Sequence, residues 1–325
     1  MNIRTVGAAV CGLVFCATNA FAQSGESSTT LNESIPANVS SQTAGWRYTL
    51  RPIPGVTSFE TIEYIDGEDR SVLYLTPVTP KFSSPPAIVL LLYRGGTPET
   101  MANLSEIGNL VAEYGVWVIL PEPDTGGWNV NPYTQDRRTN DVTFLNMVID
   151  DSIAGYNLNP HKIYMSGYSD GAFMAALYAC EQPGKIAAAG LIDSEMVNQT
   201  APTCPTQPPL PVVMFDGTDD KRVVYDGEYG QMSVPDSIAF WAQRNLCGAT
   251  PIIANLPDKD PSDGTTVQLA TYAQCSAGAL AELYTINGGG HTWPGTSVVT
   301  YGLGNTTQDI NATEILWSFF KNYSR

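Results

Sequence analysis

The five residues from Gly167 to Gly171, Gly-Tyr-Ser-Asp-Gly, constrain this chain more than any other stretch. They lie between an apolar run that predicts a strand, Lys162 to Met165, and a run of small residues that predicts a helix, Ala172 to Ala179. In a strand–turn–helix context, a G-x-S-x-G run forms a sharp turn that exposes its serine as a nucleophile. The following helix aims its N-terminal amides at the oxygen that becomes negative. The pattern predicts that Ser169 is a nucleophile and that an acid and a base follow it in the chain.

The first residues have the features of an export signal. Arg4 precedes an apolar stretch from Val6 to Ala17, and the small-x-small triplet Ala20-Phe21-Ala22 ends before Gln23. This order predicts a signal peptide over residues 1–22 and export to the periplasm or the medium. The apolar stretch is shorter than the roughly 20 residues that a membrane-spanning helix needs. We therefore expect no membrane partner.

Composition limits the possible partners further. The 325 residues include 32 acidic and 16 basic side chains, for a net charge of −16. So acidic a chain is poorly suited to bind nucleic acid or anionic polymers. The residues between 23 and 58 are rich in Ser, Thr, Asn and Pro and predict a flexible lead-in. Residues 59–325 then predict one catalytic domain, taken as a monomer by default.

Four cysteines remain after the expected cleavage: Cys180, Cys204, Cys247 and Cys275. An even number in an exported protein predicts two disulfides, with three possible connectivities. Spacing favours Cys180–Cys204 and Cys247–Cys275, because each pair would close a loop of about 25 residues. Since the chain has no C-x-x-C pair and no histidine-rich cluster, we expect no metal site. No organic cofactor is expected either.

Strand-like and helix-like stretches alternate from residue 61 onward, which predicts a mostly parallel sheet with helices on both faces. The expected strands are Thr61–Ile65, Ser71–Thr76, Ala87–Leu92, Val116–Leu120, Lys162–Met165, Ala187–Ile192, Val212–Phe215 and Leu283–Ile286. The expected helices are Met101–Tyr114, Asp141–Tyr156, Ala172–Ala179, Pro235–Asn245 and Asn311–Tyr323. No internal repeat or additional binding module is evident.

The whole chain has only two histidines that could act as the base. His161 precedes the strand of the nucleophile, at the end opposite the serine, and is expected to be structural. His291 lies in the glycine-rich segment Gly288 to Gly295 directly after a predicted strand, and histidine is the usual base for a serine nucleophile. The sequence therefore predicts that His291 is the base.

The acid is expected in the loop after the strand Val212–Phe215. A carboxylate there could accept the Nδ1–H of the histidine and hold its tautomer. Asp219 and Asp220 are neighbouring candidates, whereas Asp216 and Asp226 are expected to serve turns.

Two backbone amides must stabilise the oxyanion. The amide of Asp170 is expected to be one, and the loop Tyr93-Arg94-Gly95-Gly96 is expected to supply the other from Gly95 or Gly96, because glycine lets the backbone approach a substrate closely. Arg94 could attract an acidic group of the substrate. Aromatic residues near the expected loops are candidate substrate contacts: Trp128, Tyr133, Tyr168, Trp293 and Tyr301.

At these residues the chain resembles the secreted α/β-hydrolases related to polyhydroxybutyrate depolymerases, feruloyl esterases and acetylxylan esterases. The resemblance runs from about Phe59 to the C-terminus and is carried by five segments: Asp66 to Ser71, the helix from Asp141, the serine turn with Phe173-Met174-Ala175, Gly217 to Asp220, and Gly288 to Gly295. It implies the α/β-hydrolase fold and places the acid at Asp220. The family also has paired cysteines like the two bridges proposed above.

The resemblance implies a serine esterase, and a polyester of the polyhydroxybutyrate type is the favoured substrate. A feruloyl or acetylxylan ester on plant polysaccharide is the second hypothesis, and the β-diketone of oxidised polyvinyl alcohol is another. The family usually has His-Gly where this chain has Tyr93-Arg94. A catalytically silent binding protein on the same scaffold is the hypothesis of another class. Such a protein would be expected to lack Ser169, His291 or the acid, and this chain has all three.

Overall fold

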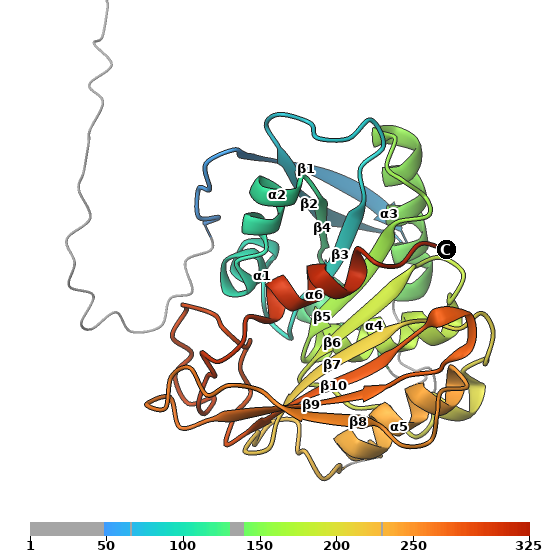
Figure 1. Cartoon of the computed structure of the whole chain (residues 1–325). Helices are drawn as coiled ribbons and strands as arrows, with labels where there is room; N and C mark the ends of the chain where they lie inside the picture. The colour runs from blue at the N-terminus through green and yellow to red at the C-terminus, as the bar shows by residue number, and fades with distance from the viewer. Residues whose placement is uncertain (1–48, 66, 131–139, 229) are drawn as a thin grey trace, which may run out of the picture. The chain divides into compact units, whose positions relative to one another are not determined.

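The ten strands of the described residues form one mixed sheet in the order β1-β2-β4-β3-β5-β6-β7-β10-β9-β8 (Figure 1). The computed structural model describes residues 49–65, 67–130, 140–228 and 230–325. The strands are β1 (Val56–Ile65), β2 (Glu68–Pro77), β3 (Ala87–Leu91), β4 (Trp117–Pro121), β5 (Ile163–Tyr168), β6 (Ala188–Ile192), β7 (Val212–Gly217), β8 (Ile252–Asn255), β9 (Thr266–Tyr272) and β10 (Ala281–Asn287). The six central strands, from β4 to β10 in sheet order, run parallel, and an antiparallel pair extends each edge.

Helices cover both faces of this sheet (Figure 1). They are α1 (Pro98–Ser105), α2 (Gly108–Tyr114), α3 (Asp141–Tyr156), α4 (Asp170–Glu181), α5 (Val234–Arg244) and α6 (Ala312–Phe320). Apolar side chains of α3, α4 and α5 share one core cluster, and those of α1, α2 and α6 share another. The α/β-hydrolase architecture expected from the sequence is therefore confirmed.

Burial of the central strands explains where the site forms. Every residue of β3, β5, β6 and β7 is buried, as expected for strands covered on both faces. Parallel strands end at a common edge of the sheet, so the loops after β5, β6, β7 and β10 lie together there. These loops begin with Ser169, Asp193, Thr218 and Gly288.

Three parts of the fold differ from the sequence expectation. The helix expected over 101–114 is two helices, because Glu106 adopts a left-handed backbone (φ 53°) that ends α1, and α2 begins at Gly108. The edge strands β8 and β9 were not predicted. Side chains of β8 are all exposed and most of β9 is half-buried, so neither presents a buried apolar run. Finally, β1 begins at Val56, inside the range expected to be a lead-in.

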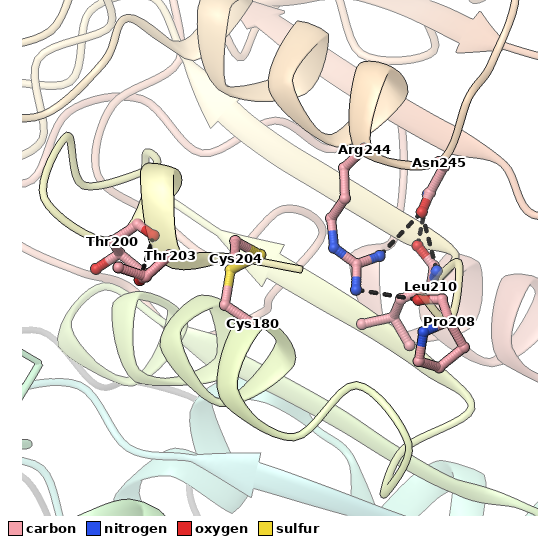
Figure 2. Close-up of a disulfide and its surroundings, with 8 residues drawn as sticks. All are labelled: Cys180, Thr200, Thr203, Cys204, Pro208, Leu210, Arg244 and Asn245. Carbon is pink, nitrogen blue, oxygen red and sulfur yellow. Dashed lines mark hydrogen bonds between the residues drawn. A yellow bond between two sulfur atoms is a disulfide. The ribbon is translucent and has the colours of Figure 1, made fainter. Parts of the chain in front are cut away.

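Both disulfides favoured by spacing are formed, Cys180–Cys204 and Cys247–Cys275. Figure 2 shows the first, which joins the C-terminal end of α4 to the segment that leads toward β7. The same segment is held at its other end by Asn245, which donates to the carbonyl of Leu210 (2.6 Å) and accepts from its amide (2.9 Å). The bridge therefore ties together the two elements that carry Ser169 and the acid loop.

The expected signal peptide and its cleavage point before Gln23 lie outside the described residues, as does Tyr133. Within the described ranges, no helix combines the length and the apolar character needed to cross a bilayer.

Candidate active site

Ser169 sits at the turn between β5 and α4 in a strained backbone conformation, with φ 55° and ψ −123°. The flanking glycines are required by close backbone approach. A Cβ on Gly167 would lie 2.3 Å from the carbonyl carbon of Gly171, and one on Gly171 would lie 2.4 Å from the carbonyl oxygen of Leu91. The turn therefore packs against its own helix and against β3, which fixes where the serine hydroxyl points.

His291 bridges the serine and a carboxylate through its two ring nitrogens. Its Nε2 lies 2.9 Å from Ser169 Oγ, and its Nδ1 lies 2.6 Å from Asp220 Oδ2. The other oxygen of Asp220 accepts hydrogen bonds from the amides of Arg222 (2.7 Å) and Val223 (3.0 Å). These amides orient the carboxylate toward the imidazole.

The two alternatives left by the sequence lie elsewhere. Asp219 is exposed, and its amide donates to the carbonyl of Gly289. His161 is exposed at the start of β5, where its carbonyl accepts from the amide of Arg325. Of the candidates weighed for acid and base, the structure brings Asp220 and His291 to Ser169.

Tyr168 supports the histidine loop. Its hydroxyl donates to the carbonyl of His291 (2.7 Å), and the two rings stack with centroids 5.1 Å apart. Burial, followed by the nearby charges of Asp193 and Asp220, raises the pKa of Tyr168 well above its usual value. The phenol therefore stays protonated and keeps donating.

Asp170, the residue after the serine, ties two loops to the turn. One carboxylate oxygen accepts from Arg94 Nη2 (2.8 Å) and the other from the amide of Trp128 (2.8 Å). Burial raises the pKa of Asp170, while the hydrogen bond from Trp128 and the charge of Arg94 act in the opposite direction. The Arg94 side chain remains 69% exposed. A cation thus lies beside the serine turn and in contact with solvent.

The oxyanion donors expected at Gly95 and Gly96 are not available in this conformation. The amide of Gly95 donates to Gly126 O (2.8 Å) and that of Gly96 donates to Tyr93 O (2.9 Å). The Gly96 amide therefore closes a turn within the loop, and the Gly95 amide binds the segment that follows β4. The amide of Arg94 has no hydrogen-bond acceptor among the residues that the structure describes.

The aromatic residues expected to contact substrate are mostly buried. Trp128, Tyr168 and Trp293 are exposed by only 3%, 3% and 1%. Their polar atoms face the protein: Trp128 Nε1 donates to Leu92 O and Trp293 Nε1 donates to Thr313 Oγ1. Their rings complete the core beneath the site, and substrate contact by these three residues stays a prediction.

Two buried acids near the site, Asp193 and Glu195, were not identified from the sequence, and Asp216 was expected in a turn but lies within β7. Asp193 and Glu195 follow β6, and Asp216 lies near the end of β7; each is only 2% exposed. Asp216 accepts from the amide of Ser194 (3.0 Å). The available signal was their position after a predicted buried strand, at the edge of the sheet where the serine and histidine loops also lie.

Glu195 is expected to make stability depend on pH. Burial, with Asp220 and Glu228 nearby, raises the pKa of Glu195 to about 8 from the 4.5 of an unfolded chain. The folded state therefore retains a proton that the unfolded state loses, and this contribution to the free energy of unfolding falls as pH rises from about 4.5 through 8. The Tm of the wild-type protein should therefore fall between pH 6 and pH 9, and in Glu195→Gln this fall should be smaller by about 5 °C. That difference corresponds to roughly 2 kcal/mol in the free energy of unfolding. Thermal unfolding of the wild-type protein and the variant at both pH values measures this difference, with Glu181→Gln as a control at an exposed position. An equal fall in Tm for the wild-type protein and Glu195→Gln would contradict the prediction.

Comparison with known proteins places the chain among esterases. No protein-family model matches it. It is 25% identical to "Putative esterase NocK" of Nocardia uniformis subsp. tsuyamanensis over 265 residues, which cover 75% of this chain and 76% of that protein. It is 30% identical to feruloyl esterase B of Piromyces equi over 175 residues, 50% of this chain but only 31% of that protein. The chain therefore spans less than a third of the length of that relative.

A solved structure supports the fold independently. The acetyl xylan esterase from Aspergillus awamori aligns with a TM-score of 0.58 at 16% identity, covering 82% of this chain and 99% of that one. At this identity the likeness concerns the fold alone. The chain therefore has the α/β-hydrolase fold. In sequence it is similar to esterases, including feruloyl esterase B and, over 142 residues at 29% identity, acetylxylan esterase A of Emericella nidulans.

Proposed function

We propose that this protein hydrolyses carboxylic esters through an acyl-enzyme formed on Ser169, with His291 as base and Asp220 as acid. The observation that carries the proposal is the continuous hydrogen-bond chain from Ser169 Oγ through His291 to Asp220, with links of 2.9 and 2.6 Å. Three residues far apart in the sequence converge in the order and geometry that acyl transfer requires. The similarity to esterases supports the same chemistry.

In the first half of the reaction, Ser169 Oγ attacks the ester carbonyl while His291 Nε2 takes its proton. The Nδ1–H then donates to Asp220 Oδ2, which stabilises the imidazolium. The negative oxygen of the tetrahedral intermediate accepts from the amide of Asp170 at the start of α4. We place the second donor at the amide of Arg94, since the amides of Gly95 and Gly96 already donate to Gly126 and Tyr93.

In the second half, His291 returns the proton to the leaving alcohol, and the alcohol departs. His291 then removes a proton from water, which attacks the acyl-enzyme carbonyl. His291 gives that proton to Ser169 Oγ as the bond from Oγ to the acyl carbon breaks, which releases the acid and restores the serine. Every step uses groups of this chain and water.

We propose an ester of a plant polysaccharide, carrying a feruloyl or acetyl group, as the substrate. Support comes from the names of the relatives, which are feruloyl and acetylxylan esterases. The polyester expected from the sequence remains a prediction. Two disulfides are typical of exported proteins and agree with a substrate met outside the cell. We propose Arg94 as a substrate contact, because its side chain is 69% exposed while it pairs with Asp170.

A hydrolysis panel tests the proposal, with each substrate assayed on the wild-type protein and on Ser169→Ala. The panel comprises p-nitrophenyl butyrate, methyl ferulate, acetylated xylan, a polyhydroxybutyrate suspension and a β-diketone. We expect Ser169-dependent hydrolysis with methyl ferulate or acetylated xylan preferred. Clearing of the polyester suspension alone would overturn the substrate assignment. An absence of Ser169-dependent hydrolysis, with no labelling of Ser169 by a fluorophosphonate, would overturn the reaction itself.

A further inference from the structure

A second carboxyl group lies against the histidine on the same side as Asp220. Asp193 is the first residue after β6, and its Oδ2 is 3.6 Å from His291 Nδ1, the nitrogen that Asp220 Oδ2 contacts at 2.6 Å. The two acids come from loops after neighbouring parallel strands, β6 and β7. Both therefore reach the imidazole from the same edge of the sheet.

The Asp193 carboxyl is held in place by its backbone and can accept a further hydrogen bond. Asp193 has a left-handed backbone (φ 52°), and its amide donates to Phe215 O on β7 (2.9 Å). The residue is 2% exposed, and the backbone amides of Gly217 and Thr292 are close enough to its carboxyl group to lower its pKa. Its Oδ2 makes no hydrogen bond of normal geometry among the described residues, which is unfavourable for a buried oxygen. It is aimed at the one nitrogen whose proton already has another acceptor.

We infer that Asp193 is a second positioning acid for His291, able to accept the Nδ1–H when the carboxylate of Asp220 is removed. The inference rests on the proposed esterase reaction and assigns a role within it. A movement of well under 1 Å would turn the 3.6 Å separation into a hydrogen bond. Because the Asp193 side chain is short and its backbone is tied to β7, that movement is a small rotation of its carboxyl group.

The groups around Asp193 explain why it does not compete with Asp220 in the wild-type protein. His291, Asp220, Asp216 and Tyr168 face it. Burial, then the charges of Asp220 and Asp216, raises the pKa of Asp193 well above its usual value. A raised pKa disfavours the ionised form of the Asp193 carboxyl, which weakens it as an acceptor for the imidazole. Of the two charges, that of Asp220 raises the pKa of Asp193 more. Removing the Asp220 carboxylate therefore lowers the pKa of Asp193 and favours its ionisation beside the imidazole.

Two substitutions of Asp220 separate this inference from a site with one acid. In Asp220→Asn, the side-chain carbonyl is expected to occupy the position that accepts from Arg222 and Val223, so the NH₂ group faces His291 Nδ1. That arrangement imposes the wrong tautomer and keeps Asp193 away, and kcat should fall about ten-thousand-fold. In Asp220→Ala no side chain blocks Nδ1, so Asp193 accepts the Nδ1–H. Because a carboxylate again holds the imidazole, kcat should fall only about 10- to 100-fold.

The decisive comparison adds Asp193→Asn to Asp220→Ala. The double variant should fall to the level of Asp220→Asn, while the matched control Asp220→Ala/Glu195→Gln should keep the activity of Asp220→Ala. Proton NMR gives a readout independent of turnover: the low-field Nδ1–H signal of His291 should persist in Asp220→Ala and disappear in the double variant. If Asp220→Ala does not fold, Asp220→Ser replaces it, because its hydroxyl can still accept from the two loop amides.

Equal activity of Asp220→Ala and the double variant, or loss of the low-field signal in a folded Asp220→Ala protein, would overturn the role of Asp193. This failure is distinct from failure of the proposed function, in which the wild-type protein itself would not hydrolyse esters.

Discussion

Replacing Ser169 by alanine is expected to lower kcat for ester hydrolysis by about a million-fold. The residual hydrolysis would come from substrate binding and the oxyanion donors alone. The loss is this large because Ser169 Oγ is the atom that forms the acyl-enzyme, and no other hydroxyl is hydrogen-bonded to the imidazole ring of His291 among the described residues. The fold should survive, since alanine removes one oxygen from a half-buried side chain. Steady-state turnover and thermal unfolding measure the two effects.

Ser318→Ala is the matched control, since Ser318 is exposed on α6, away from the loops that carry the site. It should retain wild-type turnover and react fully with a fluorophosphonate, which Ser169→Ala should not. Substantial turnover in Ser169→Ala, or labelling at another serine, would show that the strained turn is not the nucleophile.

Replacing His291 by alanine is expected to reduce kcat by a similar factor, because the general base and the proton donor to the leaving alcohol are lost together. The reduction should appear in kcat far more than in KM, since His291 is 6% exposed and acts on protons. Turnover measured across substrate concentrations separates the two constants.

The chain contains its own control for this experiment, because it has only one other histidine. His161 is exposed at the opposite end of β5, so His161→Ala should keep wild-type kcat and KM. A comparable loss in both variants would point to damage to the fold, and activity retained in His291→Ala would refute its role as the base.

Much of the fold could be predicted because its signals are local. Continuous apolar runs predicted β3, β5, β6 and β7, since strands buried on both faces have few polar positions. The helix expected over Asp141–Tyr156 has the predicted bounds. The pairs Cys180–Cys204 and Cys247–Cys275 followed from short spacing. The strands β8 and β9 were missed, since neither presents a buried apolar run.

Within the site, local patterns identified the serine and the histidine and only narrowed the acid. The glycines around Ser169 are a local signature because the turn must pack against its own helix and strand. Asp220 was distinguished from Asp219 by resemblance, and the structure brings Asp220 to the imidazole. The sequence could not decide which amide is the second oxyanion donor, because the hydrogen bonds that use the Gly95 and Gly96 amides depend on how the loop folds.

The sequence by itself determined the strand–turn–helix of the nucleophile, the order of serine, acid and base, and the alternation that produces a parallel sheet. Each of these depends on a few neighbouring residues and their allowed backbone conformations. Only the tertiary structure decided which side chains face the imidazole. It buried Tyr168 and Trp293 beneath the site and placed Asp193 beside Asp220. Such distances depend on how loops from separate strands meet at one edge of the sheet, and no local pattern encodes that packing.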